Sequence, residues 1–266
     1  MNGAMNIDLQ LNSARSSWAQ LREQSLAAEA CGFGGIWVWD HLSGATMGGV
    51  TMSDCFTLLG ALAAATSTIQ LGAMVANVQN RHAVILANSA ATAQDISEGR
   101  LLLGLGSGGG PKSPFTAEHR HAGIELRSTL AQRHQLLVDN LDLMDKVWSP
   151  QRDAAYDGFP RPSVVPPRIV GVNSEPLARI AGERADGVNV RGQADGARDL
   201  LTIACVAAGS RSFTTTVWLP FDDEHLDPDH PLRVRFADVD RLIFVAFQPT
   251  NPSLITAAGN RLVLAS

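Results

Sequence analysis

The chain has few lysines and few cysteines. Of its 21 basic residues only Lys112 and Lys146 are lysines, and the formal net charge is −5. No basic surface for nucleic acid is therefore expected. Cys31, Cys55 and Cys205 are scattered, with no histidine at the spacing of a metal site. This pattern fits free thiols in a cytoplasmic protein better than a disulfide framework, and no metal site is predicted.

Long hydrophobic runs are also lacking. No apolar stretch approaches the ~18 residues of a membrane span, and the first residues lack the core of a signal peptide. We therefore expect no membrane partner and a cytoplasmic location. Hydrophobic residues make up 45% of the chain and charged residues 18%, as in globular proteins. A chain of 266 residues suits one α/β barrel of about 250 residues.

Strand and helix patterns alternate along the whole chain. Apolar runs typical of strands cover residues 7–11, 35–39, 69–76, 101–105, 168–172, 187–190, 213–219 and 242–247. Helical patterns cover residues 16–31, 54–65, 83–96, 126–148, 176–185 and 197–208, and another helix-like stretch follows Asn251. Eight strands that are each followed by helical sequence predict a single (β/α)8 TIM barrel over residues 1–266. Two segments interrupt the pattern: a proline-rich connector at 149–167 and a short charged segment at 222–240.

The fourth predicted strand runs directly into the glycine-rich turn Gly104–Gly110. Such a turn at the carboxyl end of a parallel strand lets a ligand approach the backbone closely. The spacing of its glycines also allows a dinucleotide loop, a methyltransferase-like nucleotide loop, or a turn without a ligand. A nucleotide loop requires a helix to open at the last glycine. Here Pro111 and Pro114 follow instead, and we expect the next helix only near Glu125.

Five motifs follow one another along the chain. They lie at 27–41 (AAEACGFGGIWVWDH), 57–72 (TLLGALAAATSTIQLG), 81–87 (RHAVILA), 95–108 (DISEGRLLLGLGSG) and 181–187 (AGERADG). In this order they resemble the luciferase-like monooxygenase superfamily. The resemblance covers residues 27–190, whereas the last 75 residues are similar only in outline. It implies a TIM barrel, commonly dimeric, that binds a flavin or the deazaflavin coenzyme F-420 at the carboxyl ends of its strands.

The pair Asp40-His41 is similar to the branch that uses the deazaflavin. By this resemblance, His41 and Asp40 are the catalytic candidates, with His41 handling the proton. The implied cofactor-binding residues are Met74, Val75, Ala76, Asn77, Gly106, Ser107, Gly108, Asn173, Ser174 and Arg191. Met74 to Asn77 aligns with a stretch that often holds a cis peptide bond. Ser174 can equally serve only as a helix cap, and Arg191 only as a solvated side chain.

One departure from the family pattern weakens the catalytic interpretation. The branch often places a glutamate acid after the fourth strand, where this chain has Gly109. His41 and Asp40 then remain the only titratable groups that we expect beside the ring. The first hypothesis is an oxidoreductase that moves a hydride between F-420 and a small organic substrate. An FMN-dependent monooxygenase and a non-catalytic cofactor-binding barrel are the alternatives.

Several further residues receive simpler interpretations. Arg81 and His82 are expected to cap a helix. Trp37, Trp39 and Phe56 are expected in the core or a pocket wall. His225 and His230 are expected in a solvated acidic loop. A homodimer is expected through small apolar helix faces, namely Leu59, Leu62 and Ala63 on one helix and Ile85, Leu86, Ser89 and Ala90 on the next.

Overall fold

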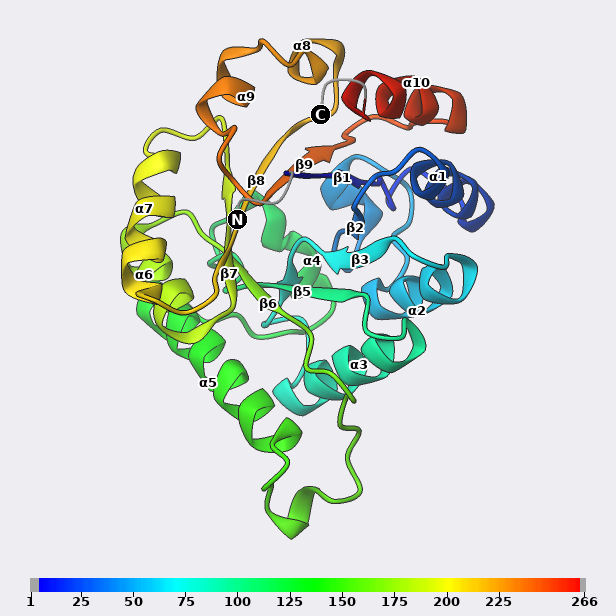
Figure 1. Ribbon diagram of the computed structural model, residues 1–266. Coiled ribbons are helices and arrows are strands. Elements are labelled where there is room, and N and C mark those ends of the chain that lie inside the picture. Colours follow the sequence, from blue (N-terminus) through cyan, green and yellow to red (C-terminus); the bar gives the residue numbers. More distant parts are fainter. Residues whose placement is uncertain (1–4, 264–266) are drawn as a thin grey trace.

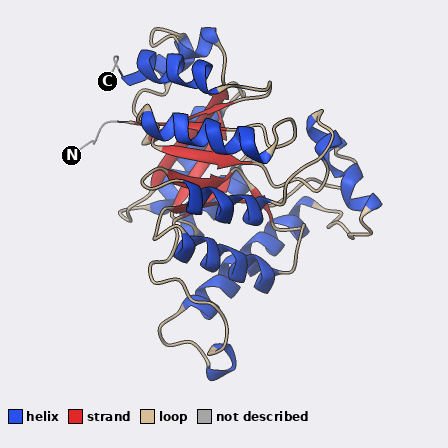
Figure 2. Ribbon diagram, turned by 90° about the vertical axis from the view of Figure 1, so that its right-hand side faces the viewer, coloured by secondary structure: helices blue, strands red, loops and turns tan. Residues whose placement is uncertain are grey.

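The computed structural model describes residues 5–263, and it forms a closed barrel of parallel strands surrounded by helices (Figures 1 and 2). The strands are β1 (Asn6–Gln10), β2 (Gly35–Val38), β3 (Gln70–Ala73), β4 (Ala76–Asn77), β5 (Leu101–Gly106), β6 (Arg168–Gly171), β7 (Gly187–Arg191), β8 (Thr214–Pro220) and β9 (Arg241–Val245). Neighbours follow the order β3-β2-β1-β9-β8-β7-β6-β5-β4, and the pairing of β3 with β5 closes the barrel. The predicted (β/α)8 fold is confirmed. β3 and β4 together occupy one of its eight strand positions, since both pair with β5.

The helices follow the strands in the expected alternation. They are α1 (Trp18–Ala30), α2 (Cys55–Ala65), α3 (Ala83–Ile96), α4 (Ala117–His121), α5 (Leu130–Trp148), α6 (Glu175–Arg184), α7 (Ala197–Ala208), α8 (Asp223–Leu226), α9 (Pro231–Arg235) and α10 (Pro252–Val263). Caps set several of these boundaries. Asp54 accepts a hydrogen bond from the Thr57 amide at the start of α2, and Thr129 forms a capping box with Gln132 at the start of α5.

Three expectations about these elements were wrong. The third predicted strand is divided in two, because a cis peptide bond between Met74 and Val75 separates β3 from β4. The helix predicted from Leu126 begins only at Leu130, and α4 precedes it unpredicted. A helix of five residues spans little more than one turn, so it leaves no apolar periodicity in the sequence.

The charged segment at 222–240 folds into α8 and α9. These short helices lie in the outer ring between α7 and α10 (Figure 1). Phe236 of this segment is fully buried, and the Arg233 guanidinium lies over the Phe244 ring. The segment therefore takes the place of one barrel helix. The proline-rich connector at 149–167 forms the protrusion between α5 and β6, with a single 3-10 turn at Ala154–Tyr156.

The barrel interior is filled by side chains from several strands. Trp37, Leu102, Ile169 and Ile243 pack together there. Toward the amino ends of the strands, Asp8 is fully buried and accepts hydrogen bonds from Trp37 Nε1 (2.8 Å) and from Arg241 Nε and Nη2 (2.8 and 3.0 Å). This packing closes one end of the barrel, so a ligand can enter only from the carboxyl ends of the strands.

The helix residues proposed for a dimer face lie mostly inside the chain. Buried residues among them are Leu59, Leu62, Ala63, Leu86 and Ala90. They pack on the barrel because α2 and α3 turn their apolar sides inward, so the prediction of these residues as a contact face was wrong. Ile85 alone among the large apolar ones is exposed (52%). Within residues 5–263, no helix is both long and apolar enough to cross a membrane.

Candidate active site

The predicted cofactor residues of the first half of the barrel lie together at the carboxyl ends of β2, β4 and β5. The backbone amide of Asn77 donates to Asp40 Oδ2 (2.8 Å), which joins β4 to the segment after β2. Asn77 is also paired in register with Gly106 on β5. Ser107 is buried, and its carbonyl accepts a hydrogen bond from Gln79 Nε2 (3.2 Å). These contacts join the carboxyl ends of β2, β4 and β5 into one edge of the opening at this end of the barrel, which we call the mouth.

Glycines make room for Val75 in the wall of this mouth. A Cβ at Gly106 would lie 2.5 Å from Val75 Cγ2, and a Cβ at Gly171 on β6 would lie 3.0 Å from Val75 Cγ1. Gly104 is closed to a side chain by the Ala73 carbonyl. The expected non-prolyl cis peptide is present at Met74-Val75. The Val75 side chain therefore packs against bare backbone in the wall of the mouth.

Asp40 is bound to Arg81 and not to His41. Arg81 donates from Nη1 to Asp40 Oδ2 (2.8 Å) and from Nη2 to Oδ1 (2.6 Å), and the Asp40 side chain is only 2% exposed. Burial lowers the pKa of Arg81, but the hydrogen bond and charge of Asp40 raise it by more. The expectation that Arg81 only caps a helix was wrong, whereas His82 does cap α3. Asp40 thus holds Arg81 and the Asn77 amide in place.

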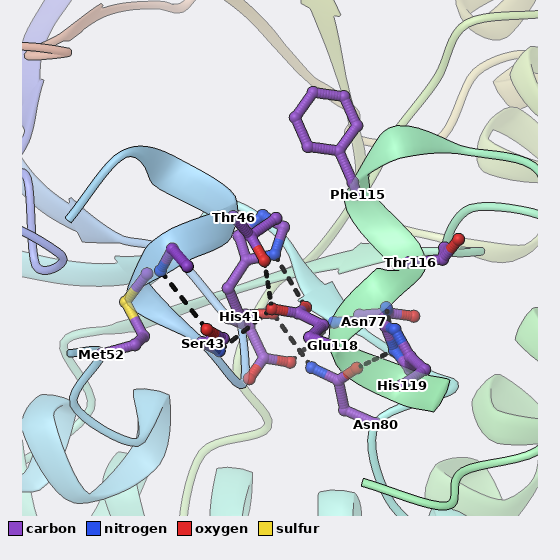
Figure 3. A network of polar contacts seen from close by, with 12 residues as sticks. His41, Ser43, Thr46, Met52, Asn77, Asn80, Phe115, Thr116, Glu118 and His119 are labelled. Atoms are coloured by element: carbon purple, nitrogen blue, oxygen red, sulfur yellow. Dashed lines mark hydrogen bonds and ion pairs between the residues drawn. The ribbon is translucent and has the colours of Figure 1, made fainter. Parts of the chain in front are cut away.

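His41 contacts a carboxylate that the sequence analysis missed. Its Nδ1 lies 2.9 Å from Glu118 Oε1, while Glu118 Oε2 accepts hydrogen bonds from the Ser43 amide (3.0 Å) and from Thr46 Oγ1 (2.8 Å) (Figure 3). Burial alone would raise the pKa of the Glu118 carboxyl, but the hydrogen bonds from His41 and Thr46 lower it by more. Glu118 is therefore ionised at neutral pH. The expectation that His41 and Asp40 are the only titratable groups at this end of the barrel was wrong.

His119, the next residue of α4, connects this helix to the segment after β4. Its Nε2 lies 2.7 Å from Asn80 Oδ1, and Asn80 Nδ2 donates to the Asp40 carbonyl (3.0 Å) (Figure 3). Burial lowers the pKa of His119 and outweighs the opposing effect of the Glu118 carboxylate. A neutral His119 with its proton on Nε2 satisfies this contact. Residues of the loops after β2 and β4 thus hold α4 in place.

The second half of the barrel provides the remaining predicted residues. Asn173 is exposed just after β6, and Ser174 is the N-cap residue of α6. The Ser174 hydroxyl is buried without a hydrogen-bond partner among the described residues. Arg191 is exposed at the end of β7, where its guanidinium lies 5.4 Å from the centre of the Trp218 ring.

An apolar rim borders the mouth on the side of β8 and β9. Trp39 and Trp218 flank Phe247, with ring centres 6.2 and 6.1 Å from it. Met74 and Trp218 both pack against the cluster of Ala14, Trp39 and Val245. As expected, Trp37 and Trp39 are buried in the core and in the wall of the mouth, and Phe56 is buried beneath Arg81.

His225 and His230 lie in the segment of α8 and α9. Their ring centres are 4.6 Å apart, and His225 is buried (5% exposed) with its Nδ1 2.7 Å from Asp222 Oδ1. The expectation of a solvated loop was therefore wrong for His225. Within the part of the chain that the structure describes, no group of three or more acidic, histidine or cysteine side chains is arranged to hold a metal ion.

Known proteins resemble this chain in sequence and in fold. An F420-dependent glucose-6-phosphate dehydrogenase of Segniliparus rotundus is 28% identical over 179 residues, which cover 63% of this chain and 51% of that protein. An F420-dependent hydroxymycolic acid dehydrogenase of Mycobacterium tuberculosis is 26% identical over 247 residues, which cover 87% of this chain and 66% of that protein. The chain thus spans about half to two thirds of the length of these two relatives.

The fold agrees with that of a solved structure. An F420-dependent secondary alcohol dehydrogenase, in complex with an F420-acetone adduct, superposes with a TM-score of 0.78 at 14% identity and covers 99% of this chain and 100% of that one. The model of the luciferase-like monooxygenase family matches residues 5–214, which is most of the sequence. The chain therefore belongs to the luciferase-like monooxygenase family, whose members are flavin- or deazaflavin-dependent oxidoreductases.

Proposed function

We propose that the protein is an oxidoreductase that transfers a hydride between the deazaflavin F-420 and a small organic substrate, with His41 as the proton-handling residue. The observation that carries this proposal is the position of His41, three residues after Val38 at the carboxyl end of β2 and in contact with a buried carboxylate. Two named relatives with this chemistry share 26–28% identity with the chain.

The residues at the mouth fit such a cofactor. The Val75 side chain lies against the bare backbone of Gly104, Gly106 and Gly171, and forms an aliphatic face against which a ring can lie. The Ser174 hydroxyl at the amino end of α6 has no hydrogen-bond partner among residues 5–263 and suits a phosphate oxygen, since amides at a helix amino end attract anions. Asn173 and Arg191 lie at the ends of the neighbouring strands and can bind the same polar tail.

The bound deazaflavin supplies a ring carbon that accepts or donates a hydride. When a hydride leaves a substrate carbon that bears a hydroxyl, the hydroxyl proton must leave as well, and His41 accepts it. In the reverse direction His41 returns the proton to the carbonyl oxygen as the hydride arrives. General acid–base catalysis of this kind contributes about 10²- to 10⁴-fold in rate. Asp40 takes no proton in this proposal because Arg81 and the Asn77 amide occupy its oxygens.

The test is cofactor titration followed by single-turnover kinetics. Wild-type protein should bind F-420 more tightly than FMN. His41→Ala should keep its F-420 affinity within a few fold while hydride transfer slows by about 10² or more. The control is His121→Ala, which removes an exposed histidine of α4. Tighter binding of FMN, or no binding of either cofactor, would contradict the cofactor assignment, and an unchanged rate in His41→Ala would remove His41 from the mechanism.

A further inference from the structure

We propose that Glu118 is a positioning residue, which holds the proton of His41 on Nδ1 and leaves Nε2 as the atom that exchanges a proton with the substrate. This inference rests on the proposed function, because it assigns a role to Glu118 only through the acid–base work of His41. It also gives a reason for the unexpected helix α4, which brings a carboxylate to His41 in a chain that has glycine at position 109.

The direction of the hydrogen bond follows from the donors around Glu118. An ionised carboxylate can only accept hydrogen bonds. Oε2 already receives the Ser43 amide and the Thr46 hydroxyl, and Oε1 faces His41 Nδ1 at 2.9 Å. Two acceptors at this distance would repel, so Nδ1 must carry a proton. In a neutral imidazole the other nitrogen, Nε2, is then the unprotonated base.

The environment of His41 leaves Nε2 accessible. The His41 side chain is 23% exposed, whereas that of Glu118 is 2% exposed. Among residues 5–263, His41 has no hydrogen-bond partner besides Glu118. The Phe115 ring is a nearby aromatic group, with its centre 6.3 Å from that of His41. His41 therefore turns one nitrogen toward the protein and keeps the other for a ligand.

Glu118 does not depend on His41 for its own position. Ser43 and Thr46 bind it from the loop after β2. His119 ties the same helix turn to Asn80. A pre-set carboxylate can fix the orientation of the imidazole without moving when a substrate binds. His119 and the Asp40–Arg81 pair are the other charged or titratable groups close by, and neither receives a hydrogen bond from His41.

Glu118→Gln is the most informative substitution because it keeps the shape of the side chain. The Ser43 amide is a fixed donor, so the amide oxygen of the new glutamine must turn toward it. Its NH₂ group then faces His41 Nδ1, which can bind that donor only as an acceptor. The proton of the imidazole is forced onto Nε2, and His41 loses its capacity to accept a proton there. The expected result is a hydride transfer from an alcohol that is slower by about 10² or more.

The tautomer can be read directly by ¹⁵N NMR of histidine-labelled protein at a pH where the imidazole is neutral, with the His41 signals assigned by comparison with His41→Ala. Wild-type protein should show a protonated Nδ1 and an unprotonated Nε2, and Glu118→Gln should show the reverse. Glu125→Gln, which changes an exposed glutamate, should leave both the spectrum and the rate unchanged. Thermal unfolding shows whether each variant is folded.

The outcomes separate this inference from the proposed function. A wild-type spectrum with the proton of His41 on Nε2 would overturn the role of Glu118, even if Glu118→Gln fails to fold. The inference would also be overturned if Glu118→Gln kept both the wild-type tautomer of His41 and the wild-type rate of hydride transfer. The NMR measurement needs no cofactor, so failure of the protein to bind F-420 would contradict the proposed function and not the tautomer.

Discussion

Replacing Asp40 by asparagine tests whether this carboxylate maintains the structure of the mouth or takes part in the chemistry. Asp40 is 2% exposed at its side chain and Arg81 is 13% exposed, so both charges are largely removed from water. Asparagine keeps an acceptor for the backbone amide of Asn77, but it removes the negative charge that compensates the Arg81 guanidinium. Breaking a buried ion pair from one side costs about 3–5 kcal/mol.

We expect about 3 kcal/mol for Asp40→Asn, near the lower end of that range, because Arg81 keeps some access to water. For a chain of this size, such a loss corresponds to a fall in Tm of about 6–12 °C. Urea and thermal unfolding followed by circular dichroism measure both quantities. The cofactor-loaded variant should still transfer hydride at a temperature where it is folded.

Asp54→Asn is the matched control. Asp54 also faces Arg81, but at 3.9 Å and with 57% of its side chain exposed. Asparagine caps a helix about as well as aspartate, so the cap of α2 is retained. The control should lose less than about 1 kcal/mol. If Asp40→Asn were as stable as Asp54→Asn but slower in hydride transfer by about 10² or more, Asp40 would be a catalytic residue and this interpretation of it would be refuted.

Three further results are expected. Gly106→Ala should lose about 1–3 kcal/mol and bind F-420 at least about tenfold more weakly, because its methyl group would meet Val75 Cγ2 at 2.5 Å. Gly158→Ala, with open space around its Cβ, should match wild type in unfolding and titration. The pKa of Glu118 is lowered in the folded protein, so the ionised carboxylate stabilises the fold at a pH above the ordinary glutamate pKa of about 4.3. This stabilisation is lost as the pH falls through the pKa of Glu118 in the folded state. Acid unfolding of Glu118→Gln should therefore depend less on pH in this range. Light scattering should show a dimer, and a mass of 28.3 kDa for the wild-type protein at all concentrations would contradict the expected homodimer.

The sequence by itself determined the barrel and the edge at which its site lies. Apolar runs of strand length alternate with helical patterns, and the closure of eight parallel strands follows from that alternation. Because every strand of such a barrel points the same way, Asp40, Asn77 and Gly106 had to meet at one mouth, as they do. The family motifs added the cis peptide at Met74-Val75.

Only the tertiary structure decided which side chains at the mouth are paired. Glu118 is 77 residues from His41 and lies on a helix of one turn, so neither periodicity nor local spacing relates the two. Arg81 reaches Asp40 across 41 residues and occupies its carboxylate, although the two residues lie on different segments of the chain. Local sequence determines strands and caps through short-range hydrogen bonds and apolar periodicity. The pairing of charged side chains requires that the packed strands and helices bring donor and acceptor atoms within about 3 Å of each other. That geometry exists only after the barrel has formed.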